Sequence, residues 1–158
     1  MSSARVSIQT GDFDLQQEIA ALHACNRCVG AICSFVGTVR DRNHDSAVSA
    51  MELEHYPGMT EKAIESMIDQ AHARFDILGA RVVHRIGLLH PPDRIMMVAV
   101  VSAHRGQSFQ ACEFLMDYLK TQAPFWKKEQ TSEGARWVDA RVADDAALAR
   151  WGLQLPNA

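Results

Sequence analysis

The chain has 158 residues, of which 47% are hydrophobic and 22% are charged, and its formal net charge is -3. These values suit one soluble domain with a substantial core. A protein that binds nucleic acid irrespective of its sequence is expected to be basic overall, so the net charge disfavours that class. Any site for an anion must therefore be built from lysine, arginine and histidine side chains that the fold gathers locally.

The apolar segments of the chain are short. The longest strongly apolar run, residues 95–101, is far shorter than the roughly 20 residues that span a bilayer. Residues 1–11 lack the apolar stretch of a secretion signal. We therefore expect a cytoplasmic protein.

The four cysteines allow two interpretations. Cys25 and Cys28 form a single CxxC motif, which together with His23 and Cys33 could supply zinc ligands or a redox pair. However, there is no second CxxC pair, and a reducing compartment argues against a disulfide framework. We interpret these residues and Cys112 as ordinary half-buried thiols with no metal site, and we keep a zinc or redox protein as the alternative.

The first half of the chain is expected to contain three strands and one helix. The predicted elements are a strand at residues 5–9, a helix at 15–23, and strands at 30–39 and 48–55. Asp14 is a suitable N-cap for the helix. Residues 41–46 are polar and turn-like, which predicts that the last two strands form a hairpin.

A second helix is expected after a break at residues 56–58. Thr60 is a good N-cap residue for it, and Gly79 would end it. Apolar residues recur in this segment at spacings of three and four, which predicts one buried face. That face comprises Ala63, Ile64, Met67, Ile68, Ala71 and Phe75.

The second half of the chain again mixes strands with one helix. We expect a strand at residues 81–86, a turn at 90–93, a strand at 95–102 buried on both faces, and short strands at 127–130 and 136–141 joined by a turn at 133–134. Ser108 could cap the intervening helix, and Pro124 cannot continue it. The side chains that this helix is expected to bury are Phe109, Cys112, Leu115, Met116 and Leu119.

This order of elements predicts the fold class. Hairpin-linked strands interspersed with helices fit an α+β fold better than a doubly wound sheet. The sequence has no internal repeat, low-complexity stretch or linker, so we expect a single domain over residues 1–158.

One candidate anion site lies where a buried strand meets a helix, at His104 and Arg105. Free backbone N–H groups and the positive end of the helix dipole meet at such a junction. A histidine and a forked guanidinium added there make a plausible cradle for phosphate or carboxylate. The alternative is a polar loop with a solvated arginine.

Three lysines make a second candidate. Lys120 ends the helix, where the dipole favours any cation. Lys127 and Lys128 follow Phe125 and Trp126, and a lysine held against aromatic rings loses hydration, which lowers its pKa and suits acid–base work. For Lys120 on its own, a charge that favours the helix end is the better interpretation. For Lys127 and Lys128, a solvated charge pair beside a core tryptophan is an equally good one.

Arg40 and Arg42 follow a predicted strand in which Gly37 lets a ligand or backbone approach closely. Arg40 could reach the same anion, although an edge arginine in a turn is the simpler interpretation of this segment alone. The remaining histidines, His44, His55, His84 and His90, share no spacing, and we interpret each as structural or solvated.

Several long segments carry a resemblance to a known family. They are FVGTVRDRN at 35–43, LEHYPGMTEKA at 53–63, HRIG at 84–87, VVSAHRGQSFQA at 100–111, MDYLKTQAPFWKKE at 116–129 and GARWVDAR at 134–141. In these segments the chain resembles the large, catalytic subunit of molybdopterin synthase, in one register from about residue 30 to residue 151. The N-terminal stretch with its CxxC adds nothing to the match.

The resemblance implies an α/β-hammerhead fold with an additional small antiparallel sheet. It implies a homodimer of large subunits with a ubiquitin-like small sulfur-carrier subunit at each end, a heterotetramer. It also implies a sulfurtransferase of molybdenum cofactor biosynthesis, which moves sulfur from the thiocarboxylated C-terminus of the small subunit to cyclic pyranopterin monophosphate. Two such transfers form the dithiolene of molybdopterin, and no metal or organic cofactor is needed.

Site residues follow from matching positions. The resemblance implies Lys120 and Lys127 as catalytic residues and Phe35 and Met116 as pocket wall. The implied substrate-binding residues are Thr38, Val39, Arg40, His104, Arg105, Lys120, Lys127, Lys128 and Glu129. This chain departs from the pattern at Thr38, where many family members carry lysine, which puts an ionic role there in doubt. A docking scaffold without catalysis is a further alternative, and an unrelated phosphate-ester enzyme would need a nucleophile or metal cluster that we do not find.

Overall fold

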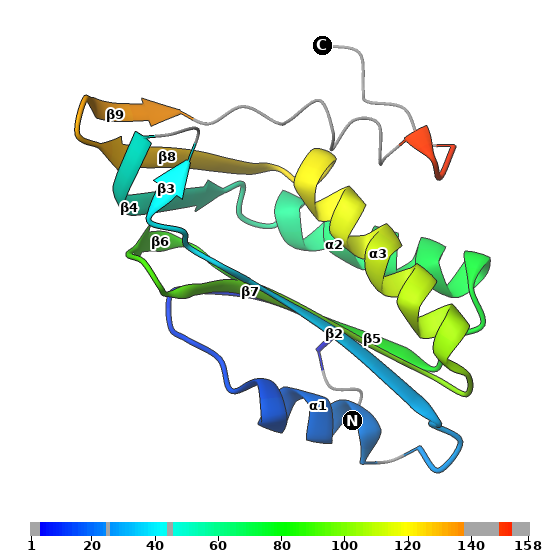
Figure 1. The fold of residues 1–158 in the computed structure, drawn as a ribbon. Coiled ribbons are helices and arrows are strands. Elements are labelled where there is room, and N and C mark those ends of the chain that lie inside the picture. The colour runs from blue at the N-terminus through cyan, green and yellow to red at the C-terminus, as the bar shows by residue number, and fades with distance from the viewer. Residues whose placement is uncertain (1–3, 25, 44–45, 138–148, 153–158) are drawn as a thin grey trace.

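The computed structural model describes residues 4–24, 26–43, 46–137 and 149–152. Helices and strands alternate as an α+β fold, which confirms the predicted class (Figure 1). In chain order the elements are β1 (Val6–Gln9), α1 (Leu15–His23), β2 (Ala31–Thr38), β3 (Arg42–Asn43), β4 (Ser46–His55), α2 (Met59–Arg74), β5 (Gly79–Arg85), β6 (Gly87–Leu89), β7 (Arg94–Ser102), α3 (Arg105–Thr121), β8 (Phe125–Thr131) and β9 (Gly134–Trp137).

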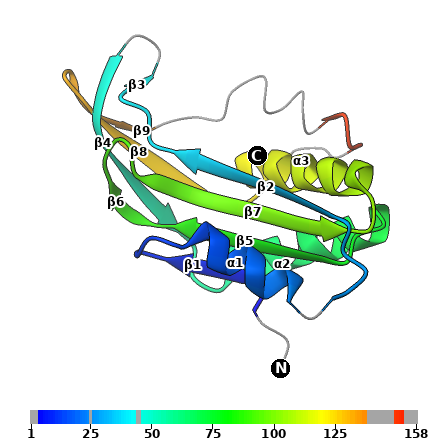
Figure 2. The same ribbon diagram turned by 60° about the horizontal axis from the view of Figure 1, so that its bottom comes forward.

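The main sheet has the strand order β1-β5-β7-β2. β1 runs parallel to β5, and the other pairs are antiparallel. Helices α2 and α3 lie over one face of this sheet and α1 over the other (Figures 1 and 2). Asp14 caps α1 as predicted, because its Oδ1 accepts a hydrogen bond of 3.0 Å from the backbone N–H of Gln17.

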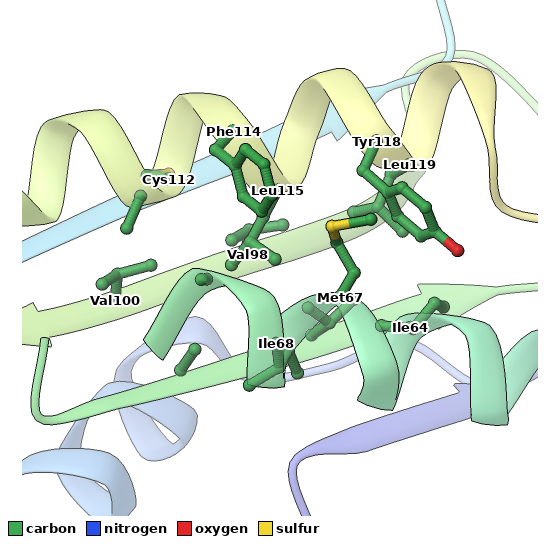
Figure 3. Close-up of a cluster of buried hydrophobic side chains, with 14 of the residues drawn as sticks. Ile64, Met67, Ile68, Val98, Val100, Cys112, Phe114, Leu115, Tyr118 and Leu119 are labelled. Atoms are coloured by element: carbon green, nitrogen blue, oxygen red, sulfur yellow. The ribbon is translucent and has the colours of Figure 1, made fainter. Parts of the chain in front are cut away.

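The core fills both sides of β7. Val98 and Val100 point toward α2 and α3, where they meet Ile64, Ile68 and Leu115 (Figure 3). Met97 and Ala99 point the other way and pack with Phe13 under α1. Burial on both faces was predicted from the unbroken apolar run, and each fully buried side chain of this size contributes about 1.5–3 kcal/mol.

A second sheet of five strands has the order β3-β4-β8-β9, with β6 also paired to β4. The predicted hairpin between the strands at 30–39 and 48–55 is wrong. β2 pairs with β7 instead, and the chain crosses to the second sheet between Thr38 and Arg42. A turn-like segment between two strands does not determine which strands pair. Pairing with the apolar β7 buries β2 better than a local hairpin would.

Two predicted helix caps are also wrong. α2 begins at Met59 with Gly58 before it, because the hydroxyl of Thr60 is engaged in tertiary hydrogen bonds. α3 begins at Arg105 with His104 as N-cap, and Ser108 Oγ donates to the carbonyl of Arg105 within the helix.

Three details of the helices and strands differ from expectation. α2 ends at Arg74, and Gly79 starts the next strand rather than stopping the helix. Phe109, predicted to be buried, is 61% exposed because it lies on the outer face of α3. β9 begins at Gly134, in the predicted turn, and residues 138–141 of the predicted last strand lie outside the described residues.

Candidate active site

The strand β2 and the helix α3 start at the same end of the molecule and run in the same direction (Figure 1). Ala31, the first residue of β2, pairs with Ser102, which lies just before α3. Further along, the thiols of Cys33 and Cys112 meet; burial, and then Cys33, raise the pKa of Cys112 to about 12. Cys112 therefore stays protonated and serves as packing rather than as a nucleophile.

Because β2 and α3 run in the same direction, residues late in β2 and residues late in α3 lie toward the same end of the molecule. Phe35 lies on the same face of β2 as Cys33, the face toward α3, and is 42% exposed. Met116 and Lys120 lie in the second half of α3, beyond Cys112. The pocket-wall residues and Lys120 are thus at the end of the helix that adjoins the second sheet.

Lys127 approaches from that second sheet. It lies on β8 opposite Leu53 of β4, on the face that packs inward with Val39 and Leu89. The positive charges of Lys127 and Lys120 both act to lower the pKa of His84. The convergence of the two lysines after Pro124 stays a prediction, and their common electrostatic action on His84 is consistent with it.

His84 itself is a buried residue of β5, 7% exposed. Its ring stacks on Phe125, with centroids 3.8 Å apart and an interplanar angle of 17°. Burial, opposed by a hydrogen bond to the Arg85 carbonyl and assisted by Lys120, lowers the pKa of His84 to about 4. The imidazole is therefore neutral at pH 7. Its Nδ1 lies 2.8 Å from the Arg85 carbonyl oxygen, which only accepts, so Nδ1 carries the proton and Nε2 is an acceptor.

Arg40 lies just past β2 at the edge of a surface hollow of about 560 Å³. The hollow is also lined by Val39, Asp41, Arg42, Pro91 and Pro92. Thr38 and Arg40 are exposed, but Val39 is a core residue whose N–H donates to the Asp93 carbonyl at 2.8 Å. Val39 can therefore shape the site but has no side-chain group to bind a charge.

Lys128 lies on a different face of β8 from Lys127 and Glu129. Lys128 is on the opposite face of β8, where its Nζ lies 5.6 Å from the centre of the Trp137 ring. Glu129 is only 3% exposed and pairs with Arg136 of β9 at 3.5 Å. Its carboxylate lies on the inner face but is engaged in holding the two strands.

His104 and Arg105 are at the other end of α3. Both side chains are exposed at the first turn, as the anion-cradle prediction requires. The helix has 17 residues and is about 25 Å long, so within one chain it separates Arg105 from Lys120. The structure therefore divides the predicted phosphate-binding residues into two groups, with Arg40 and the lysines at one end and His104 and Arg105 at the other.

A surface hollow of about 670 Å³, larger than the one at Arg40, has none of the predicted lysines in its lining. It lies beside α1 and is lined by Asp12, Phe13, Asp14, Leu15, Gln16, Ile19 and Arg94. Arg94 is already paired with Asp12 at 2.9 Å, so this hollow presents acidic and apolar groups and suits an anion poorly. Size alone does not identify the site here.

The alternative of a zinc protein gains no support from the described part of the chain. None of its histidine, cysteine and carboxylate side chains forms a group of three that could hold a metal ion. Cys25 lies outside the described residues, and Cys28 is exposed. None of the described helices is long and apolar enough to cross a bilayer.

Fold and site together define a class of protein. It is an α+β domain in which lysines of a helix and a strand both act electrostatically on a buried neutral imidazole, an arrangement that suits an anionic substrate. The family model described as MoaE protein matches residues 8–122, and this chain belongs to that family.

Individual relatives agree with this assignment. The molybdopterin synthase catalytic subunit of Ralstonia nicotianae is 61% identical over 153 residues, which are 97% of this chain and 87% of that protein. The solved structure of the molybdopterin biosynthesis MoaE protein from Burkholderia ambifaria is 59% identical, with a TM-score of 0.82 over 96% of this chain and all of that one. A complex of subunits 1 and 2 of molybdopterin-converting factor from Helicobacter pylori shares the fold at 20% identity, with a TM-score of 0.71 over 87% and 92% of the two chains.

Proposed function

We propose that this chain is the catalytic subunit of a molybdopterin synthase. It transfers sulfur from the thiocarboxylated C-terminus of a small sulfur-carrier subunit to cyclic pyranopterin monophosphate. The observation that carries the proposal is that the charges of Lys120 and Lys127 both act on the buried His84, at the end of the molecule where Arg40 follows β2. The relatives named above carry this function in their names.

The chemistry needs positive charge at two places. In each transfer the sulfur of the thiocarboxylate bonds to a side-chain carbon of the pterin while a C–O bond of that carbon breaks, and the oxygen leaves either on the opened phosphate ester or as water. Water then cleaves the bond between that sulfur and the acyl carbon, which leaves a thiolate on the pterin and a carboxylate on the carrier. Both steps develop negative charge, which a fixed ammonium group stabilises. We assign Lys120 to the acyl group and Lys127 to the pterin and its protons, because Lys120 ends the helix and Lys127 lies on the inward face of the second sheet.

We propose that the phosphate site is completed by a second copy of the chain. Within one chain, α3 separates Arg105 from Lys120 by about 22 Å, too far for one small substrate. β2 is the outer strand of the main sheet among the described strands, and its Ile32 and Phe35 are 43% and 42% exposed. Such an open, apolar edge favours pairing with another strand.

Pairing of two β2 edges about a twofold axis would bring the residues at one end of the first chain next to those at the opposite end of the second chain. In an antiparallel pair, the end of one β2 lies beside the start of the other. The start of β2 adjoins the His104 loop, because a side chain at Gly30 would come within 2.3 Å of the Ala103 carbonyl oxygen. Arg40 of one copy would thus lie near His104 and Arg105 of the second copy.

The small partner and the compartment belong to the same proposal. A ubiquitin-like carrier subunit would bind each end of the dimer and insert its C-terminal tail toward Lys120 and Lys127. The Helicobacter complex of subunits 1 and 2 supports a two-subunit assembly for this fold. We further propose that the protein works in the cytoplasm.

The test is reconstitution of the purified chain with a thiocarboxylated small subunit and the pterin precursor, followed by detection of molybdopterin. We expect product in proportion to thiocarboxylate consumed. Binding of the small subunit without product would instead support the docking scaffold. Stoichiometric zinc in the purified protein, lost on removal of Cys25 and Cys28, would support the metal alternative.

A further inference from the structure

The segment that joins α3 to β8 also joins the two lysines of the proposed site. Lys120 is the second-last residue of α3 and Lys127 the third residue of β8, so residues 121–126 set their relative position. Two buried side chains from other elements, Thr60 of α2 and His84 of β5, contact this segment at adjacent residues. Neither takes part in the chemistry proposed above.

Thr60 holds the segment by its backbone. It is 0% exposed, and its Oγ1 donates to the Pro124 carbonyl at 3.0 Å. The same oxygen accepts from the N–H of Tyr56 at 3.0 Å. One hydroxyl thus ties the start of α2 to the turn after α3, and its removal would leave both backbone groups without this partner.

His84 holds the next residue by its ring. The stack on Phe125 fixes that side chain, and the hydrogen bond from Nδ1 to the Arg85 carbonyl fixes the imidazole in turn. The charged and titratable groups that act on His84 come from three elements: Lys120 of α3, Lys127 of β8 and His55 of β4. His55 is itself 3.4 Å from Glu61 of α2.

A neutral imidazole suits this place better than a third cation. An imidazolium at this position would be repelled by the charges of Lys120 and Lys127, whereas the neutral ring fills the space and offers Nε2 as an acceptor. A phenylalanine would fill the space equally but would offer no acceptor and no bond to Arg85. The chemistry of the ring, and not only its bulk, therefore bears on where the lysines lie.

We propose that His84 and Thr60 are positioning residues of the sulfur-transfer site, which clamp Pro124 and Phe125 so that Lys120 and Lys127 meet the substrate in a fixed geometry. This inference rests on the proposed function. It adds two residues that touch neither substrate nor carrier and act through the lysines. A purely structural role predicts a loss of stability alone; a positioning role predicts a loss of rate in the folded protein.

Thr60→Val and Thr60→Ser separate the two roles at Thr60. Valine keeps the shape and loses the hydroxyl, whereas serine keeps the hydroxyl. We expect the single-turnover rate at saturating carrier and precursor to fall by about 10-fold to 10²-fold in Thr60→Val and to recover in Thr60→Ser, because small misplacements of reacting groups are costly. The affinity for the small subunit should not change in either variant.

The matched control is Thr131→Val. The Thr131 hydroxyl also donates to a carbonyl, that of Gly134, and accepts an N–H, that of Glu133, but it lies at the far end of β8. This variant should keep the wild-type rate. His84→Phe provides the second test and is expected to lose rate while keeping the stack on Phe125.

The decisive measurement is a double-mutant cycle. If His84 acts through Lys127, the loss caused by His84→Phe should largely vanish in a Lys127→Ala background. Additive losses, or wild-type single-turnover rates in folded Thr60→Val and His84→Phe, would overturn the inference. If either Thr60→Val or His84→Phe fails to fold, the single-turnover rate of the other variant tests the inference. An inactive wild-type reconstitution would count against the proposed function itself, so the two failures are distinct.

Discussion

Lys127 and Lys128 are neighbours in the chain but lie on opposite faces of β8. Lys127 stands opposite the core residue Leu53 on the inward face, whereas Lys128 lies over the ring of Trp137 on the outward face. Strand alternation thus gives two lysines of equal charge quite different surroundings. Lys128 therefore serves as a comparison for Lys127, and the difference between their surroundings comes from the structure.

The first prediction concerns the lysines. Lys120→Ala and Lys127→Ala should keep the fold and the binding of the small subunit. Each should lose roughly 10²-fold or more of the single-turnover rate, as expected for a preorganised electrostatic or acid–base group. Lys62→Ala, exposed on α2, is the control for both, and Lys128→Ala should lose less rate than Lys127→Ala because Lys128 lies on the outward face of β8. Wild-type rates in both pocket variants would contradict the assignment.

The second prediction concerns the shared phosphate site. Arg40→Ala and Arg105→Ala should each be nearly inactive alone. If each site takes Arg40 from one copy and Arg105 from the other, mixed dimers contain one intact site. Random mixing of the two variants should then restore about a quarter of the wild-type activity.

The assay for this prediction is activity after the two variants are unfolded together and refolded, with sedimentation to confirm the dimer. No recovery in a mixture of confirmed hybrid dimers would show that the two arginines act in one chain or in separate sites. A mass of one chain at micromolar concentration would contradict the dimer.

The third prediction concerns the departure at Thr38. This residue is exposed at the end of β2, next to Arg40. Thr38→Lys should change the rate little and tighten precursor binding slightly, since exposed charge pairs contribute about 0–1 kcal/mol. The measurement is precursor affinity by titration at two salt concentrations. A large loss of activity in a folded variant would show that the pocket requires the smaller residue.

The fourth prediction concerns two glycines near the His104 loop. A Cβ at Gly30 would lie 2.3 Å from the Ala103 carbonyl oxygen, but one at Gly106 meets nothing within 4 Å. Gly30→Ala should destabilise the protein by about 1–3 kcal/mol, since backbone must shift to admit the methyl group. Gly106→Ala lies within α3 and should be neutral or stabilising by up to about 1 kcal/mol. Urea unfolding of both variants checks the contrast.

The fifth prediction concerns acid stability. Because the pKa of His84 falls from 6.5 to about 4 in the folded state, the unfolded chain binds the proton first on acidification. The contribution of His84 to the free energy of unfolding is therefore fully present above pH 6.5. It is lost progressively as the pH falls from 6.5 toward 4. The difference corresponds to about 3 kcal/mol, as an order of magnitude.

The check is urea unfolding of the wild type and His84→Phe at several pH values between 4 and 7. The variant should lose less stability than the wild type over this range, because phenylalanine takes up no proton. Parallel curves for the two proteins would show that His84 is already protonated in the folded state or accessible to water.

Much of the local structure could be predicted from sequence. Asp14 caps α1, the 3.6-residue spacing gives the buried face of α2, and the apolar run of β7 is buried on both sides. These features depend on side-chain patterns within a few turns or one strand. The lysine and arginine positions were likewise available, because long segments of the chain resemble one family.

The partners of these elements were decided by the tertiary structure. Thr60 was expected to cap a helix, but its hydroxyl binds Pro124, 64 residues away. His84 was interpreted as structural or solvated, and only packing shows that it is neutral and that the charges of both lysines act on it. The resemblance placed Arg40 and Arg105 in one site, yet one chain holds them at opposite ends of α3. Local patterns specify which face of an element is buried, but which distant residues meet depends on how the elements pack, and no short-range pattern encodes that.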